Sequence, residues 1–169
     1  LRKSEEFMST IFDRSPHPVW ISDHRGVLIR INQSCCDLLN IGKEEVIGKY
    51  SILDDDIVAE QGLLPLVRNV FQRGKTVRFE ITYDTSRRKQ IELRKGISVV
   101  LDTSISPIMD SSGRVTNAIV QHVDVTARKR AEEELRESRR RLSDIIEFLP
   151  DATFVIDKNG RVVAWNRAI

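Results

Sequence analysis

The chain has 169 residues, of which 40% are hydrophobic and 31% charged, and its formal net charge is +2 at pH 7. That composition is typical of a folded globular protein and too apolar for a disordered one. The nearly balanced charge indicates no nucleic-acid partner, and the basic clusters at residues 87–89 and 139–141 are interpreted as solvated surface. No apolar run approaches the roughly 18 residues that a membrane span requires. The sequence therefore predicts no membrane span and a cytoplasmic location, with an anchor elsewhere in a longer parent protein left open.

Residues 1–15 are predicted to form a flanking helix that ends before Pro16, because the residue preceding a proline is disfavoured in the helical region. One face of this helix repeats at spacings typical of a heptad: Leu1, Ser4, Met8 and Ile11. Two β-rich runs follow at residues 19–22 and 27–31, and the short turn between them ends in glycine, so a hairpin is expected. Asn32 is then placed to cap a short helix.

No metal site is predicted. Cys35 and Cys36 are adjacent and lack the spacing of a metal-binding pair, and a disulfide between neighbours is strained, so reduced thiols are expected. The acidic run at residues 54–56 lacks the alternating ligands of a calcium loop and is interpreted as a helix cap or a loop.

The middle of the chain predicts one helix and three strands. Residues 60–73 carry apolar side chains at helical spacing, with Pro65 in the first turn of the expected helix. Alternating residues predict a strand over 77–83, and two further strand runs cover 91–108 and 115–125. Together with the hairpin, these runs predict an α+β domain in which small helices lie on one face of a five-stranded antiparallel sheet.

The charged segment at residues 127–149 contains no glycine or proline and is predicted to form a connector helix. Thr126 lies at its start, where a hydroxyl is suited to cap the free amides of the first turn. A heptad seam runs along the segment: Ala131, Leu135, Ser138, Leu142, Ile145 and Leu149. This seam favours a coiled-coil linker helix in a parallel homodimer. The alternative is an amphipathic helix packed on its own domain.

The beginning and the end of the chain match without a gap when residue 1 is aligned with residue 135. The matching pairs include Pro16 with Pro150, Asp23 with Asp157, Gly26 with Gly160 and Asn32 with Asn166. These are helix-stop, turn and cap positions, where the backbone restricts the choice of residue. The pattern predicts a domain at residues 16–126, a linker helix at 127–149 and the truncated start of a second copy at 150–169.

Four stretches resemble the Per-Arnt-Sim (PAS) family of sensor domains. They are Asp23-x-x-Gly26, the Asn32 after the second strand, residues 42–48, and the run from Asp124-Val125-Thr126 to Glu132, which is similar to the family's "DIT-x-RK" ending. The resemblance covers residues 8–126, and residues 142–169 look like the start of a second PAS domain. It implies the PAS fold. Because tandem PAS domains joined by such helices usually belong to sensor histidine kinases, it also implies a kinase or other output domain in the same chain.

The resemblance also guides the expectation about cofactors. Flavin-binding members carry a reactive cysteine in a Gly-Arg-Asn-Cys motif, and the matching stretch here ends in Ser51, so a cysteinyl-flavin adduct is not expected. Haem-binding members usually ligate iron through a histidine on the long helix, whereas residues 58–74 contain none, so a b-type haem is not expected either. The identity of any cofactor is left unknown.

His122 stands two residues before Asp124, where flavin-binding members have the glutamine that contacts the flavin. The resemblance therefore implies that His122 points into the cavity of the domain. Two interpretations stay open. One is a ligand-binding or pH-responsive group, and the other is a core histidine satisfied by backbone or water.

Together these features predict a sensory relay module. The predicted lining of an interior ligand pocket consists of Cys36, Phe71, Phe79, Val99, Val120 and His122. Ligand binding would repack the final strand, and Asp124 and Thr126 would pass the shift into the helix. The alternative is a ligand-free module for dimerisation and signal relay. Catalysis is not predicted for this segment, because the sequence has no nucleophile–base constellation or phosphate-binding loop.

Overall fold

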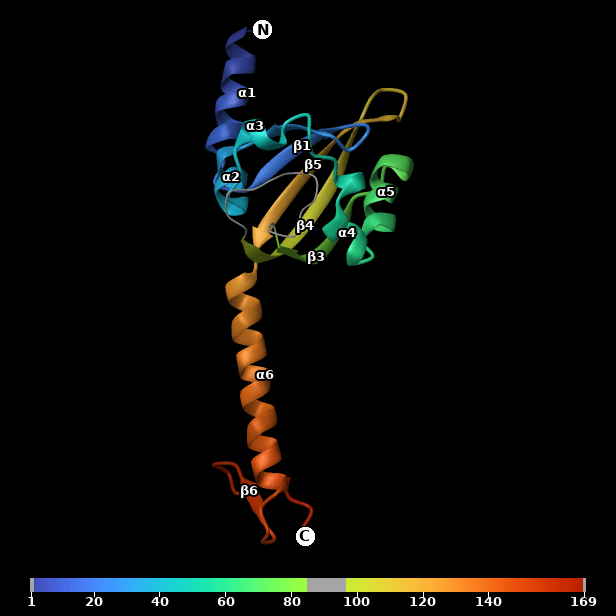
Figure 1. The fold of residues 1–169 in the computed structure, drawn as a ribbon. Helices are drawn as coiled ribbons and strands as arrows, with labels where there is room; N and C mark the ends of the chain where they lie inside the picture. Colours follow the sequence, from blue (N-terminus) through green and yellow to red (C-terminus); the bar gives the residue numbers. More distant parts are fainter. Residues whose placement is uncertain (1, 85–96, 169) are drawn as a thin grey trace. The chain divides into compact units, whose positions relative to one another are not determined.

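The computed structural model describes residues 2–84 and 97–168 (Figure 1). These residues divide into two compact units, one ending at Thr126 and the other beginning at Ala127. Within the described ranges, no helix combines the length and the apolar character needed to cross a membrane.

The first unit is organised on one five-stranded antiparallel sheet with the strand order β2-β1-β5-β4-β3 (Figure 1). The strands are β1 Val19–Asp23, β2 Leu28–Ile31, β3 Val77–Asp84, β4 Ser98–Met109 and β5 Val115–Asp124. The predicted sheet is confirmed. β5 begins and ends within one residue of the expected bounds, and β4 ends within one residue of its expected end. Residues 85–96, which hold the expected basic loop and the expected start of the fourth strand, lie outside the described residues.

Helices pack against one face of this sheet (Figure 1). They are α2 Gln33–Leu39, α3 Lys43–Val46, the single turn η1 Ile52–Asp54, α4 Asp56–Glu60 and α5 Leu64–Arg73, and α1 Arg2–Arg14 precedes the first strand. The helix predicted over residues 60–73 is confirmed from Leu64 to Arg73, but its predicted start at residue 60 is wrong. Gly62 has a φ of +71° and ends the preceding turn, so the chain forms α4 and then starts α5 with Pro65 in its first turn.

The core lies between these helices and the inner face of the sheet. Strand residues alternate between the two faces, which buries Trp20 of β1, Leu101 and Ile105 of β4 and Val120 of β5. The helices contribute side chains such as Val67 to the same cluster. Each fully buried side chain of this kind stabilises the fold by about 1.5–3 kcal/mol. Such short helices are barely stable in isolation, so most of their stability comes from this packing.

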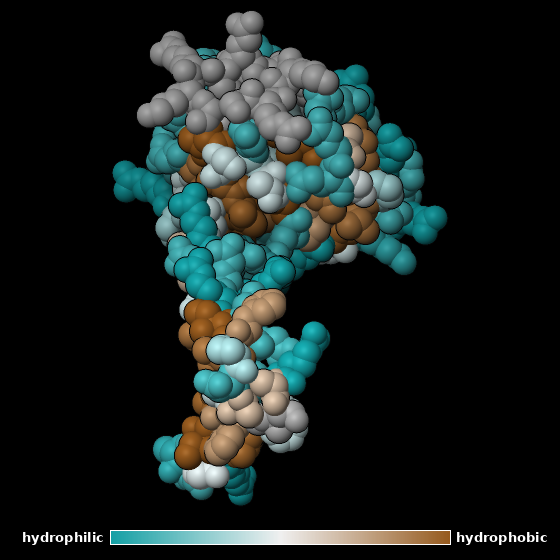
Figure 2. Space-filling view, turned by 60° about the horizontal axis from the view of Figure 1, so that its bottom comes forward, coloured by the Kyte–Doolittle hydropathy of each residue, from teal (hydrophilic) through white to brown (hydrophobic). Residues whose placement is uncertain are grey.

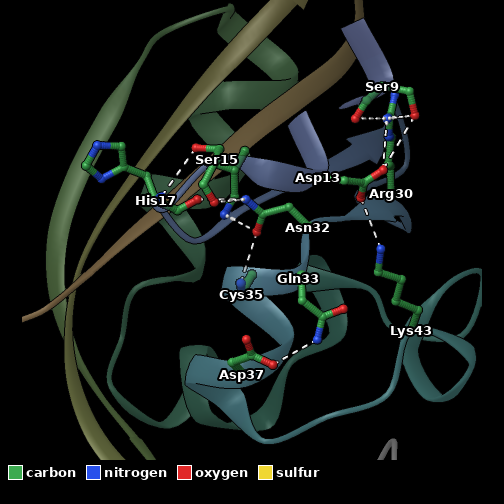
Figure 3. Close-up of polar contacts among 11 residues, drawn as sticks. Ser9, Asp13, Ser15, His17, Arg30, Asn32, Gln33, Cys35, Asp37 and Lys43 are labelled. Carbon is green, nitrogen blue, oxygen red and sulfur yellow. Dashed lines mark hydrogen bonds and ion pairs between the residues drawn. The ribbon is translucent and has the colours of Figure 1, made fainter. Parts of the chain in front are cut away.

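The side chain of Asn32 connects the segment between α1 and β1 to the start of α2 (Figure 3). It is fully buried, and its Oδ1 accepts hydrogen bonds from the backbone N–H groups of Val19 and Cys35 at 3.1 and 2.9 Å. Its Nδ2 donates to the carbonyls of Ser15 and His17. The predicted cap is confirmed, and the same side chain also fixes the turn before β1.

Asp13 ties the end of α1 to the domain (Figure 3). Its carboxylate lies 3.0 Å from the Lys43 ammonium and 3.7 Å from the Arg30 guanidinium. Arg30 also donates to the Ser9 hydroxyl at 2.7 Å and lies over the ring of Phe12 at 4.4 Å. The last turns of α1 are therefore held by charge and by a cation–π contact rather than by burial.

The second unit contains most of α6 Thr126–Glu147 and a hairpin formed by β6 Phe154–Ile156 and β7 Val162–Trp165. Its hydrogen bonds reproduce those of the first hairpin. Asn166 bonds Thr153, Leu149 and Asp151 just as Asn32 bonds Val19, Ser15 and His17. The turns after Asp23 and Asp157 are equally alike, since each carboxylate accepts from the amides two and four residues further on. The internal repeat thus extends to its side-chain contacts.

Candidate functional site

An interior cavity of about 30 Å³ lies between the helices and the inner face of the sheet. Its wall is mainly aliphatic and aromatic, with polar groups from Trp20, Tyr50, Tyr83, Thr103 and His122. A volume of this size admits about two water molecules. The space is therefore far smaller than the roughly 300–1,000 Å³ of a typical pocket for an organic ligand.

Two of the six predicted pocket residues, Phe79 and His122, line this cavity. The others do not, which corrects the predicted lining. Val120 is fully buried in the hydrophobic core, Phe71 and Val99 pack at the margin of the core, and Cys36 lies buried on α2. An inward-facing position is not necessarily a pocket position, because side chains fill most of the space beneath the sheet.

His122 is buried and both of its ring nitrogens are engaged. The Trp20 indole donates its Nε1–H to His122 Nε2 at 3.1 Å, and Nδ1 lies 2.9 Å from the Thr103 hydroxyl. An indole nitrogen is only a donor, so Nε2 must be the unprotonated nitrogen. The geometry therefore assigns a neutral ring whose proton is on Nδ1 and points to Thr103. The two hydrogen bonds of His122 thus link strands β1, β4 and β5.

Asp55 forms a second buried polar centre on the helical side of the core. The side chain is only 2% exposed, and one carboxylate oxygen accepts from the hydroxyls of Tyr50 and Tyr83. The other oxygen accepts from the backbone amides of Ile57 and Val58 and caps α4. Asp55 thus carries out the predicted capping role and also links α4 to β3.

The polar groups around the cavity are consequently bonded to one another. Trp20, His122 and Thr103 form one chain, and Tyr50, Tyr83 and Asp55 form another. The two chains meet where the rings of Trp20 and Tyr50 pack edge to face, with centroids 5.6 Å apart. A ligand that used the Trp20 N–H or either ring nitrogen of His122 would have to replace an existing hydrogen bond.

The junction between β5 and α6 is attached to β4 by side-chain as well as backbone bonds. The backbone N–H of Val125 donates to the carbonyl of Val100 at 2.9 Å, and the N–H of Val100 donates to the Thr126 hydroxyl at 2.9 Å. The Asp124 carboxylate accepts from the N–H of Thr126 at 2.8 Å. The Thr126 hydroxyl therefore continues the sheet ladder onto β4, which differs from the predicted cap of the first helical turn.

The predicted dimer seam is exposed on α6, none of whose residues is buried. Leu135, Leu142 and Ile145 each have more than half of their surface accessible, and Leu149, just beyond the helix, is also exposed. Ala131 and Ser138 complete the seam and are exposed as well. Figure 2 shows apolar (brown) surface among the polar (teal) side chains in the C-terminal part of the chain.

Sequence reasoning missed the partners of the buried polar groups. Trp20 and Thr103 are separated from His122 by long stretches of chain, and so is Asp55 from Tyr83. Strand alternation was the available signal for Trp20, since it faces the core in the first β-rich run. The described residues contain no group of three or more side chains suited to a metal ion.

A sequence profile described as the PAS fold matches residues 6–125, and a second one described as a PAS domain matches residues 140–169. The first match covers well over half of the chain. The chain belongs to the PAS family. The second match supports a further PAS domain that begins within the C-terminal residues. No curated protein sequence matches the chain significantly.

Several solved structures, a PAS domain among them, share its fold. An RNA-binding light-oxygen-voltage receptor has a TM-score of 0.63 and 18% identity over 80% of this chain, which spans only 36% of that receptor. The PAS domain of BvgS from Bordetella pertussis has a TM-score of 0.53 and 20% identity, over 82% of this chain and 98% of that one. A domain of a sensor histidine kinase/response regulator from Geobacter sulfurreducens has a TM-score of 0.53 and 14% identity, over 72% and 94%. At these identities the likeness concerns the fold.

Proposed function

We propose that this chain is a relay module of a larger signalling protein and that its PAS domain works without a bound ligand. The observation that carries the proposal is the cavity of about 30 Å³, whose polar groups are already bonded to one another. A filled interior transmits a displacement from one wall to another, because close-packed side chains deform little. The input is then a change of packing rather than occupancy of a pocket.

In this proposal the output leaves through the β5–α6 junction. Val100, Val125 and Thr126 connect the end of β5 to β4, so a shift between these strands moves the first residue of α6 directly. The helix passes the movement on as a pair with α6 of a second copy. Its exposed seam supports a homodimer, and the likeness to a domain of a sensor histidine kinase/response regulator supports a histidine kinase or other output domain in the same protein.

Small-molecule sensing is a second candidate function. It is favoured by the position of His122 at the cavity wall, where a ligand that takes over its bond to Trp20 would alter β1 and β5 together. Such a ligand would need the cavity to expand, since the present volume admits only water-sized molecules.

Native mass spectrometry of the purified 169-residue chain, with an absorption spectrum, separates the two functions. The relay proposal expects the mass of the polypeptide or its dimer, no visible absorbance, and the same melting temperature before and after unfolding and refolding in ligand-free buffer. A stoichiometric added mass, or a melting temperature that drops after refolding and is restored by an extract of the native protein, would establish the ligand-binding function instead.

A further inference from the structure

Helix α6 has 22 residues, and none of them is buried in the described chain. A helix of this length extends about 33 Å, at 1.5 Å per residue. Its apolar residues nevertheless form one stripe, and Leu135, Leu142 and Ile145 are 53%, 58% and 55% exposed. A helix whose apolar stripe is exposed in this way among the described residues is suited to pair with a helix of the same kind.

The residues that flank the stripe define how two such helices pair. With Leu135 and Leu142 at the a positions and Ser138 at d, Glu134 occupies a g position and Arg139 the following e position. In a parallel, in-register pair, each g residue faces the e residue five positions further along the other helix. Glu134 of each helix therefore faces the partner's Arg139, and the two-fold symmetry forms this ion pair twice.

The antiparallel arrangement that overlaps the whole stripe gives the opposite result. There, e residues face e residues and g residues face g residues across the pair. Arg139 then meets the partner's Arg139 on one side of the stripe, and Arg141 meets the partner's Arg141 on the other. An antiparallel pair shifted by one heptad avoids these contacts but leaves one end of the stripe without apolar partners on the other helix. These unpaired residues are Ile145 and Leu149 for one direction of the shift, and Ala131 and Leu135 for the other.

We propose that α6 pairs in parallel and in register with α6 of a second copy, and that the reciprocal Glu134–Arg139 ion pairs select this arrangement. The inference rests on the homodimer of the proposed function and adds the residues that select its parallel orientation. Ser138 lies between the two pairs, and a small polar residue there weakens the apolar contact, so that the flanking charges have more influence on the orientation.

Charge reversal in the 169-residue chain tests the ion pairs by sedimentation equilibrium in low salt. Glu134→Arg and Arg139→Glu each place like charges across the pair, so we expect the dimer dissociation constant of each variant to rise at least about tenfold. The difference should shrink in 0.5 M salt, which screens exposed charges. Glu133→Arg and Arg140→Glu are matched controls, because the same reversals then lie at outward-facing f positions and should leave the dissociation constant unchanged.

Mixing the two reversed chains gives the complementary result. In a parallel heterodimer the arginine side chain of the Glu134→Arg variant faces the glutamate side chain of the Arg139→Glu variant. On the other side of the stripe, the unchanged Glu134 of the second variant faces the unchanged Arg139 of the first, so both attractive pairs return. Native mass spectrometry of an equimolar mixture should therefore show mainly heterodimer, whereas each variant alone is mainly monomeric.

Cross-linking tests the orientation. Cysteines at position 138 are adjacent in the parallel, in-register pair, whereas in the antiparallel pair with full overlap residue 138 faces residue 142. Ser138→Cys should form a covalent dimer under mild oxidation, and Ser143→Cys, at an outward-facing b position, should not. Cys35 and Cys36 are buried, and burial raises the pKa of the Cys36 thiol, so they do not compete.

The outcomes are distinguishable. A dimer that tolerates both charge reversals, fails to form the heterodimer, or cross-links equally at positions 138 and 143 overturns this pairing but leaves the homodimer in place. A wild-type chain that remains monomeric at all accessible concentrations overturns the homodimer itself, and this inference with it.

Discussion

His122 shows how single residues join the strands of this domain. The Trp20 indole can only donate, so the ring of His122 is neutral and presents its Nδ1–H to Thr103. Protonation at Nε2 would set an N–H against the N–H of Trp20 and remove that bond. The hydrogen bond from Trp20 to His122 is therefore both the structural contact of His122 in the core and the contact that a pH response of His122 would break.

Thr103→Val tests this assignment. The substitution keeps the shape of the side chain but leaves the buried Nδ1–H of His122 without its acceptor, so we expect unfolding to become easier by about 1–3 kcal/mol. Denaturant unfolding measures the loss. Thr82→Val on the exposed side of β3 is the matched control and should change stability by less than about 0.5 kcal/mol. A Thr103→Val protein as stable as the control would show that the hydroxyl is not the acceptor.

At the scale of the elements, the β5–α6 junction is distinctive because a side chain extends the sheet. Thr126 supplies a hydroxyl where the next backbone carbonyl would accept from Val100. We expect Thr126→Val to expose the Val100 amide, so that it exchanges with deuterium faster while the rest of β4 stays protected. Hydrogen exchange read by NMR measures this. In the control Thr116→Val, at the far end of β5, Val100 should exchange as in the wild type. Equal protection of Val100 in both variants would contradict the assigned bond.

Most elements could be predicted from the sequence because local rules determine them. Strand alternation, the turn after Asp23 and the cap at Asn32 depend on residues close together in the chain. The break at Gly62 was missed because apolar spacing continues across it, although the glycine backbone turns there. The cavity lining was only partly found, since it depends on how side-chain volumes fill the space under the sheet. The Asp55–Tyr83 bond depends on tertiary packing, which local patterns do not encode.

At the scale of the whole molecule, the repeated hairpins define a modular unit. Asn32 and Asn166 make equivalent hydrogen bonds to the segment that precedes each hairpin. The end of α6 therefore precedes the second hairpin in the same way as α1 precedes the first. Asp13 pairs with Lys43 near the end of α1, and Glu147, at the matching position of α6, pairs with Arg167 at 3.1 Å. We infer that each flanking helix is attached at its end to the domain that follows, so α6 serves as the exit of one domain and the entry of the next.

The central claim is that the junction at Asp124 and Thr126 controls a pair of α6 helices. Distances between nitroxide labels on Ser143→Cys, measured by pulsed electron paramagnetic resonance in the 169-residue chain, test it directly. We expect one narrow distance in the otherwise native dimer, and a broadened or shifted distribution when Asp124→Ala removes the bond to the Thr126 amide. Asp110→Ala removes the same kind of carboxylate–amide bond, from the turn between β4 and β5, and should leave the distribution narrow. Absence of dipolar coupling, or an Asp124→Ala distribution identical to that of Asp110→Ala, would contradict the claim.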